Sequence, residues 1–347
     1  MGIRVPEKRN VSSEHAFWSA VVHDPVLAWL LHPSEPAARY LASRDLVRPR
    51  PSERSLARLR AEIPRRGVAA RILARQKQRT YWATKKTCYL PKFSSTIWQL
   101  QVLADLGMSR RDERIANAVE LWFDLHLARD GGYSPWSRLE AEQHARTHFR
   151  HPGTLLKHGH LCTTGNMVRS LIRLGYLADE RVQGAIRWLV DEQYPDGGWD
   201  CFGRKKGTID AWEAMSALAE VPPSRRGSDA KRALADGAEF FLRRRLLHEG
   251  PRYARWCGCR YPWHYHYDFL VGLDFLSALG HGPDPRMREA LANLAAKRLP
   301  DGRWKLDHTN GNLVVEHRGK PSKMISFLAR RVARRVGGEW RRRIEGP

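Results

Sequence analysis

Two cysteines and two histidines in distant loops of this sequence have the side-chain types that bind zinc. Cys201 follows Cys162 after 39 residues, and His264 follows Cys201 after 63 residues. Thiolate sulfur and imidazole nitrogen are good zinc ligands, and a catalytic zinc site keeps one position open. We therefore expect Cys162, Cys201 and His264 to bind a metal, with zinc as the expected cofactor. The alternative is that the thiols are buried and the histidines only donate or accept hydrogen bonds.

Two carboxylates, Asp210 and Asp268, precede apolar helical segments and have Trp and Tyr neighbours. A carboxyl group in an apolar, aromatic pocket has a raised pKa and can protonate a substrate. We expect Asp210, Asp268 and His266 to be the catalytic residues.

Other interpretations of these residues stay open. An Asp at a helix start often serves as the N-cap. Asp210 and Glu213 are three residues apart and match a capping-box-like pair. His160 and Cys162 could form a thiolate nucleophile pair.

Repeats of two helices would have to bring these residues together. A helix, a turn, a second helix and a second turn recur over 95–133, 165–199, 209–247 and 267–304. Within the second repeat, Met167, Leu171 and Leu174 fall three or four residues apart, which is the helical period. A degenerate copy of the repeat turn lies upstream, and a last helix is expected over 321–336. The pattern therefore predicts about six helical pairs. We expect an all-α, (α/α)6-type toroid, with an open α-solenoid as the alternative.

The repeats also predict where a site would form. If each repeat has an inner helix followed by an outer one, the inner helices all start at one rim of the ring. The loops that enter them are 91–98, 160–166, 203–212, 261–268 and 319–324, which are dense in Cys, His, aromatic residues and Lys. Helix N-termini favour anions. We expect the substrate to be bound at this rim by Trp98, Asn166, Trp212, Tyr265, Lys92 and Lys323.

The segment DEQYPDGGW at 191–199, with the shorter ARDGGY and LPDGRW, resembles the Gln…Asp-Gly-Gly-Trp repeat of the terpene cyclase and protein prenyltransferase superfamily. The stretches LCTTGNMVRSLIRLGYL, YLPKFSSTIWQL and KPSKM resemble a prokaryotic group that is described by its prenyltransferase/squalene-oxidase repeats. The resemblance covers roughly residues 25–336 and implies a toroid with a central cavity. It does not extend to known chemistry, because the Asp-x-Asp-Asp acid motif is missing. In place of the zinc-binding Asp-x-Cys of the prenyltransferases, Asp200 and Cys201 are adjacent.

These observations predict an enzyme acting on an apolar, isoprenoid-type substrate with a diphosphate or other anionic head in the central cavity. The reaction would be an acid- or metal-assisted cyclisation or transfer. Two alternatives stay open: a zinc-dependent enzyme of different chemistry that uses Cys162, Cys201 and a histidine, and a non-catalytic basic toroid that binds a partner.

The charge of the chain limits its partners. The 347 residues carry a formal net charge of +23, which favours anionic partners, including peripheral contact with a membrane surface. No nucleic-acid-binding motif is found. The sequence lacks a signal-peptide core and a long apolar run, so we expect a cytoplasmic protein. We expect an N-terminal extension over 1–24, one toroid domain over 25–337 and a basic tail over 338–347.

Overall fold

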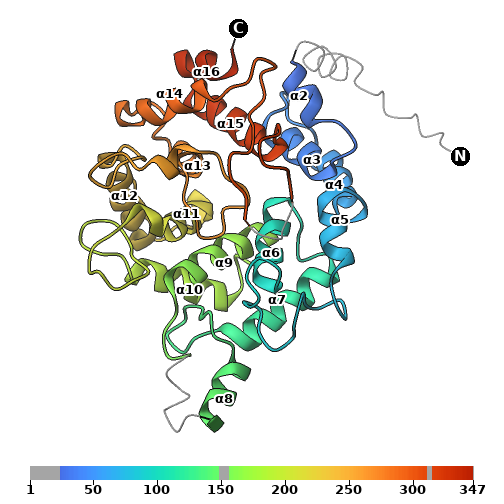
Figure 1. The fold of residues 1–347 in the computed structure, drawn as a ribbon, viewed down its shortest axis with the longest axis vertical. Coiled ribbons are helices and arrows are strands. Elements are labelled where there is room, and N and C mark those ends of the chain that lie inside the picture. Colours follow the sequence, from blue (N-terminus) through green and yellow to red (C-terminus); the bar gives the residue numbers. More distant parts are fainter. Residues whose placement is uncertain (1–23, 148–155, 311–314, 347) are drawn as a thin grey trace, which may run out of the picture.

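The protein is all-α, with helices joined by turns and isolated β-bridges. The computed structural model describes residues 24–147, 156–310 and 315–346. The chain winds once around a ring, so that α2 and α3 near its start lie beside α15 near its end (Figure 1). This closure confirms the predicted toroid and argues against an open solenoid.

In the described part of the chain, six helices line the inside of the ring. They are α3 (Pro36–Asp45), α6 (Thr96–Asp105), α9 (Leu161–Leu174), α11 (Trp212–Glu220), α13 (Phe269–Ala278) and α15 (Lys323–Val336). The outer helices are α5 (Gly67–Ala74), α7 (Glu113–His126), α10 (Glu180–Asp191), α12 (Ser228–Arg243) and α14 (Arg288–Ala296). Helices α2 (Pro25–Leu30), α4 (Glu53–Glu62), α8 (Arg138–Thr147) and α16 (Gly338–Glu345) complete the set, and α8 lies outside the ring (Figure 1).

The two sets of helices differ in how much of their surface is buried. All ten residues of α6 are buried, because other elements surround an inner helix. Outer helices bury one stripe and expose the other side to water, as the helical period predicts. In α10 the buried residues are Val182, Ala185, Ile186, Trp188 and Leu189.

Three tryptophans in the repeated turns contact the outer helices α5, α10 and α14 in the same way. The indole Nε1 of Trp82, Trp199 and Trp304 donates to the carbonyl ten residues earlier, at 2.8, 2.8 and 2.9 Å. All three rings are buried. The turn aromatics therefore anchor the last turns of the outer helices.

The same turns also fix where the inner helices begin. A hydroxyl group in the first turn of an inner helix accepts the backbone N–H of the preceding turn aromatic. The pairs are Thr96 with Trp82 (3.2 Å), Thr164 with Tyr133 (2.8 Å) and Ser326 with Trp304 (3.0 Å). These bonds fix where α6, α9 and α15 begin on the rim.

The end of the chain is packed onto the ring. Residues 338–347, expected as a basic tail, contain α16, whose Ile344 is fully buried. Glu345 in α16 pairs with Arg330 at 3.4 Å. The expected N-terminal extension lies outside the described residues up to residue 23. Among the described helices, each is too short or too polar to cross a lipid bilayer.

Candidate active site

Four of the five predicted entry loops meet at one pocket, at the N-terminal ends of α6, α9, α11 and α13. Its volume is about 350 Å³. We call it the rim pocket; it is lined by Tyr89, Lys92, His160, Cys162, Cys201, Phe202, Thr208, Asp210, Ala211, Glu213, Tyr265 and His266. The repeat pattern thus brings together side chains that are far apart in sequence.

Three sulfur and nitrogen ligand atoms cluster in the rim pocket. One atom each from His160, Cys162 and Cys201 lies within 4.8 Å of the others, and His160 Nδ1 is 3.3 Å from Cys162 Sγ. The hydrogen bond from Cys162, followed by burial, raises the pKa of Cys201 above its usual value. Two thiols and an imidazole fit zinc, which would have one further position open. The ligand set therefore suits a metal, with His160 as the histidine.

His264, the expected third ligand, lies outside this cluster. Its Nδ1 hydrogen-bonds to Oε1 of Gln101 at 2.9 Å, and its ring stacks on Phe93 with centroids 5.4 Å apart. Burial lowers the pKa of His264 to about 3, so the ring stays neutral. Its packing is that of a buried structural histidine.

Glu213 brings a buried carboxyl group to the rim pocket. The residue is 1% exposed and lies in the first turn of α11. Burial, reinforced by the charge of Cys201, raises the pKa of Glu213 well above its usual value. Its Oε2 atom has no hydrogen-bond partner among the described residues. Burial therefore favours the protonated form of Glu213 more than that of an exposed carboxyl group, and one of its oxygens has no hydrogen-bond partner among the described residues.

Asp210 lies beside Glu213 in the rim pocket wall. Its Oδ1 accepts a hydrogen bond from Nε1 of Trp256 at 3.1 Å. Partial burial raises the pKa of Asp210. The residue is not the N-cap of α11, since a short 3-10 helix from Ile209 to Ala211 precedes that helix. Asp210 thus lines the rim pocket with an exposed carboxyl group that does not cap α11.

Asp268, the other expected acid, is the N-cap of α13. Its side chain accepts hydrogen bonds from the backbone N–H of Val271 (2.9 Å) and Arg260 (2.7 Å) and from Nε1 of Trp263 (3.1 Å). Burial raises the pKa of Asp268 to about 7. The carboxyl is fully buried and is not among the rim pocket residues. Its contacts are those of a helix cap.

Three of the expected substrate-binding residues do not line the rim pocket but support the residues that do. Trp98 Nε1 donates to the Tyr89 carbonyl at 2.8 Å, and Trp212 Nε1 donates to the Tyr265 carbonyl at 3.4 Å. Asn166 Nδ2 donates to the His264 carbonyl at 2.7 Å. All three side chains are buried. They position the residues that line the pocket.

Tyr265, His266 and Lys92 do reach the rim pocket. The hydroxyl of Tyr265 contacts that of Tyr89, and the Lys92 ammonium lies 5.4 Å from the centre of the Tyr265 ring. Partial burial, followed by the charge of Arg260, lowers the pKa of His266 to about 4. His266 is therefore neutral at pH 7 and can accept a proton.

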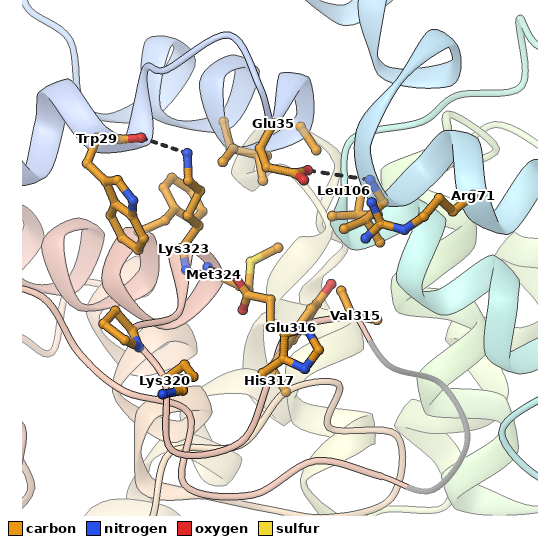
Figure 2. Close-up of a pocket in the computed structure, with 17 residues that line it drawn as sticks. Trp29, Glu35, Arg71, Leu106, Val315, Glu316, His317, Lys320, Lys323 and Met324 are labelled. Atoms are coloured by element: carbon orange, nitrogen blue, oxygen red, sulfur yellow. Dashed lines mark hydrogen bonds between the residues drawn. The ribbon is translucent and has the colours of Figure 1, made fainter.

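Lys323, from the fifth entry loop, lies in a different cavity. That cavity, of about 320 Å³, lies where α15 meets α2 and α3 (Figure 2). The Lys323 ammonium donates to the Trp29 carbonyl at 2.7 Å. The neighbouring Glu316 carboxylate accepts the backbone N–H of Lys323 at 2.6 Å, at the start of α15. Lys323 thus joins the two ends of the ring.

Three residues of the rim pocket are not predicted as functional groups from the sequence. Tyr89 and Phe202 flank entry loops, and their spacing gives no specific signal. The sequence predicts Glu213 only as a capping partner. The available signal was an acidic residue one turn inside a segment that is otherwise apolar, IDAWEAMSALAEV.

No family model and no curated protein matches this sequence. Among solved structures, the chain is similar to a protein from Actinoplanes, at 15% identity and a TM-score of 0.45, over 93% of this chain and 99% of that one. It is also similar to the type II terpene cyclase MstE from Scytonema. The apo form matches at 12% identity and a TM-score of 0.44, over 94% and 98% of the two chains. A complex of MstE with geranylgeranyl dihydroxybenzoate matches at 11% and 0.46, over 94% and 99%. The fold and site described above rest on this chain's own helices and side chains.

Proposed function

We propose that the protein is an enzyme that acts on a small apolar, isoprenoid-type substrate with an anionic head in the rim pocket. The reaction is an acid-assisted cyclisation or transfer. One observation carries this proposal: Glu213 is buried, its pKa is raised, and Oε2 has no partner among the described residues. A neutral carboxyl in this position has a proton to give to a substrate.

The lining of the rim pocket supports this substrate class. Tyr89, Phe202 and Tyr265 supply aromatic surface, which suits an apolar chain and stabilises cations that form on it. Lys92 and the N-termini of the inner helices favour an anionic head. A volume of about 350 Å³ falls within the usual range for small-molecule sites.

The proposed step moves one proton. The O–H bond of Glu213 breaks as its proton passes to a carbon of a substrate double bond. The electron pair of that double bond forms the new C–H bond and leaves a cation on the neighbouring carbon. To complete the cycle, Glu213 regains a proton from water, and the product cation loses a proton to a base. Asp210 and His266, which line the same pocket, are placed to accept that proton.

Turnover of prenyl diphosphates tests the proposal. Purified protein is incubated with geranyl, farnesyl and geranylgeranyl diphosphate, and products are followed by mass spectrometry. We expect wild-type protein to convert at least one of them and Glu213→Gln to lose about 100-fold or more in rate. Glu120→Gln, on the exposed side of α7, is the matched control and should leave the rate unchanged. Failure of the wild type to bind or convert any of the three, or full activity in Glu213→Gln, would refute the proposal.

A second candidate, a zinc-dependent enzyme, is favoured by the clustered ligand atoms of His160, Cys162 and Cys201. Bound zinc supplies Lewis acidity or an activated water at neutral pH. In that case the three residues hold the ion, Glu213 holds or delivers a proton beside it, and the aromatic wall excludes water.

Metal analysis decides this second candidate. Protein dialysed against zinc is assayed for metal content per chain. The candidate predicts one zinc per chain in the wild type and in His264→Ala, and loss of that zinc in His160→Ala and Cys201→Ser. The absence of stoichiometric metal in the wild type, or its retention in both ligand variants, would exclude a zinc site at this cluster.

A further inference from the structure

A third cavity lies at the ends of the inner helices opposite the rim pocket. Its volume is about 430 Å³, and each of the six inner helices contributes to its wall. The wall contains six arginines and four carboxylates, so we call it the arginine cavity. The charged residues are Arg44, Arg60, Arg173, Arg226, Arg331, Arg335, Asp45, Asp105, Glu220 and Asp274.

The four carboxylates are all committed to arginines. Arg331 makes a bidentate contact with Asp274, at 2.9 and 2.7 Å, and also reaches Asp45 at 3.2 Å. On the other side of the cavity, Arg173 hydrogen-bonds to both Asp105 and Glu220. Arg44 also pairs with Asp45 at 2.6 Å, and Arg335 pairs with Asp274 at 2.9 Å. Four of the six arginines thus contact the four carboxylates, and the charged residues of the wall have an excess of two positive charges.

The excess resides on two arginines that have no carboxylate partner among the described residues. Arg60 donates from Nε and Nη2 to the carbonyls of Gly107 and Met108, at 2.7 and 2.8 Å. Arg226 donates from Nε and Nη2 to two carbonyls at the end of α11, at 2.8 and 3.1 Å. Carbonyl oxygens at a helix end supply only a partial negative charge. The Nη1 groups of both arginines have no partner among the described residues.

The titration behaviour of the arginines agrees with this charge excess. Desolvation in the cavity wall lowers the pKa of Arg60, Arg226 and Arg335 below the usual arginine value. For Arg60, Tyr40 raises the pKa, and the charges of Arg44 and Arg111 lower it. For Arg335, the charge of Asp274 raises the pKa, and that of Arg331 lowers it. An arginine pKa falls only where positive charge is poorly solvated and incompletely neutralised.

We propose that the arginine cavity binds a small, multiply charged oxyanion of the phosphate type. A phosphate group presents several oxygens, which can accept hydrogen bonds from separate guanidinium groups at once. An anion of charge two would neutralise the excess on the wall. This site is additional to the proposed enzymatic function, since the rim pocket lies at the other ends of the same helices.

The wall of the arginine cavity is covalently connected to the rim pocket by one short segment. Trp263 lines the arginine cavity, and Tyr265 and His266, two and three residues later, line the rim pocket. The Arg169 guanidinium lies 5.2 Å from the centre of the Trp263 ring. A bound anion in contact with Trp263 would therefore affect the position of the segment that carries Tyr265 and His266.

Calorimetric titration with inorganic diphosphate at constant ionic strength tests the site. The full-length wild type should bind it saturably at one site per chain. Arg226→Gln, in the loop before α12, and Arg60→Gln, in α4, should each weaken binding about tenfold or more, because each removes a charged donor. Arg232→Gln, on the exposed face of α12, and Glu213→Gln, in the rim pocket, should leave the affinity unchanged. Circular dichroism of each variant checks that it is folded.

Two results would overturn the proposal: the absence of saturable diphosphate binding by the wild type, or an unchanged affinity in both Arg226→Gln and Arg60→Gln. A competition arm distinguishes the sources of the oxyanion. If a prenyl diphosphate displaces inorganic diphosphate from the wild type, the cavity takes the head of an organic phosphate. If the two bind independently, it takes the free ion. Neither result depends on turnover in the rim pocket.

Discussion

Gly165 and Glu213 lie in direct backbone contact between α9 and α11. A Cβ atom placed on Gly165 would stand 2.6 Å from the carbonyl carbon of Glu213 and 2.8 Å from the nitrogen of Ala214. Backbone atoms cannot move aside as a flexible side chain can. The absence of a side chain at 165 is therefore what lets α11 approach α9 and bring the Glu213 carboxyl to the rim pocket.

Substitution Gly165→Ala should separate the two helices. We expect the free energy of unfolding to fall by about 1–3 kcal/mol, which is typical of overpacking a tight core. We also expect a loss of any activity that depends on Glu213. Gly184→Ala in α10 is the matched control, because its nearest neighbour would be the Arg187 Nη2 at 3.9 Å. In Gly184→Ala the free energy of unfolding should stay the same or rise by about 0.5–1 kcal/mol. Equal effects in both variants, measured by urea unfolding, would contradict the close-contact account.

The three turn tryptophans should be energetically equivalent. Trp82→Phe, Trp199→Phe and Trp304→Phe each remove the indole donor to a helix-end carbonyl and reduce the volume of a buried side chain. The Ile72 and Leu294 carbonyls keep a second donor, the backbone N–H of Arg75 and of Lys297. The lost hydrogen bond and the lost packing should together cost each variant about 1–3 kcal/mol of stability. Trp136→Phe is the control, because Trp136 is 47% exposed and should have little effect. A loss confined to one of the three turns would show that they are not equivalent supports.

Acid should destabilise the protein through His126. Its Nε2 accepts the Cys88 N–H at 3.1 Å, and its Nδ1 bonds to the Ser134 carbonyl at 3.0 Å, so the buried ring is neutral. Burial lowers its pKa from 6.5 to about 4. The unfolded chain therefore binds the extra proton first. The neutral His126 ring therefore contributes about 3 kcal/mol to the free energy of unfolding. This contribution is fully present above pH 6.5 and is lost as the pH falls through 6.5 towards 4.

Urea unfolding between pH 4 and 7 measures this contribution. His126→Gln should be less stable at pH 7, because it cannot reproduce both hydrogen bonds, but its stability should fall less steeply with acid. His264, with a pKa of about 3, retains part of the slope in both proteins. An identical slope in the variant and the wild type would exclude His126 as an acid-sensitive group.

Much of the fold and the rim was predictable, because helical periodicity survives in a single sequence. The apolar stripes and Gly turns located the inner helices, and a common chain direction placed their entry loops at one rim. For this reason Cys162, Cys201, Asp210, Tyr265 and His266 reach one pocket.

The predicted positions of His264 and Lys323 are wrong because both depend on contacts between segments that are distant in sequence. His264 has a positive φ of 51°, which turns its side chain into the core beside Gln101 and leaves His266 at the pocket. A repeat alignment cannot choose between histidines two residues apart. Lys323 does not reach the rim pocket, because its loop lies where the two ends of the ring meet. There its ammonium group donates a hydrogen bond to the Trp29 carbonyl. That contact joins residues 294 positions apart.

The position at which α11 begins explains why the sequence does not predict Glu213 as a pocket residue. The sequence suggests that the helix begins at Asp210, which would make Glu213 a partner in its cap. The chain instead forms a short 3-10 helix, and α11 begins at Trp212. This puts Glu213 inside the first turn, against Gly165, with its carboxyl buried.

The protonation state of Glu213 tests the central claim most directly. Infrared difference spectra between wild type and Glu213→Gln at pH 7 isolate the signal of this one side chain. A buried neutral acid predicts the carbonyl stretch of a protonated carboxyl group in the wild type and its loss in the variant. If the difference spectrum instead contains the bands of an ionised carboxylate at pH 7, Glu213 cannot be the acid, and the proposed reaction fails.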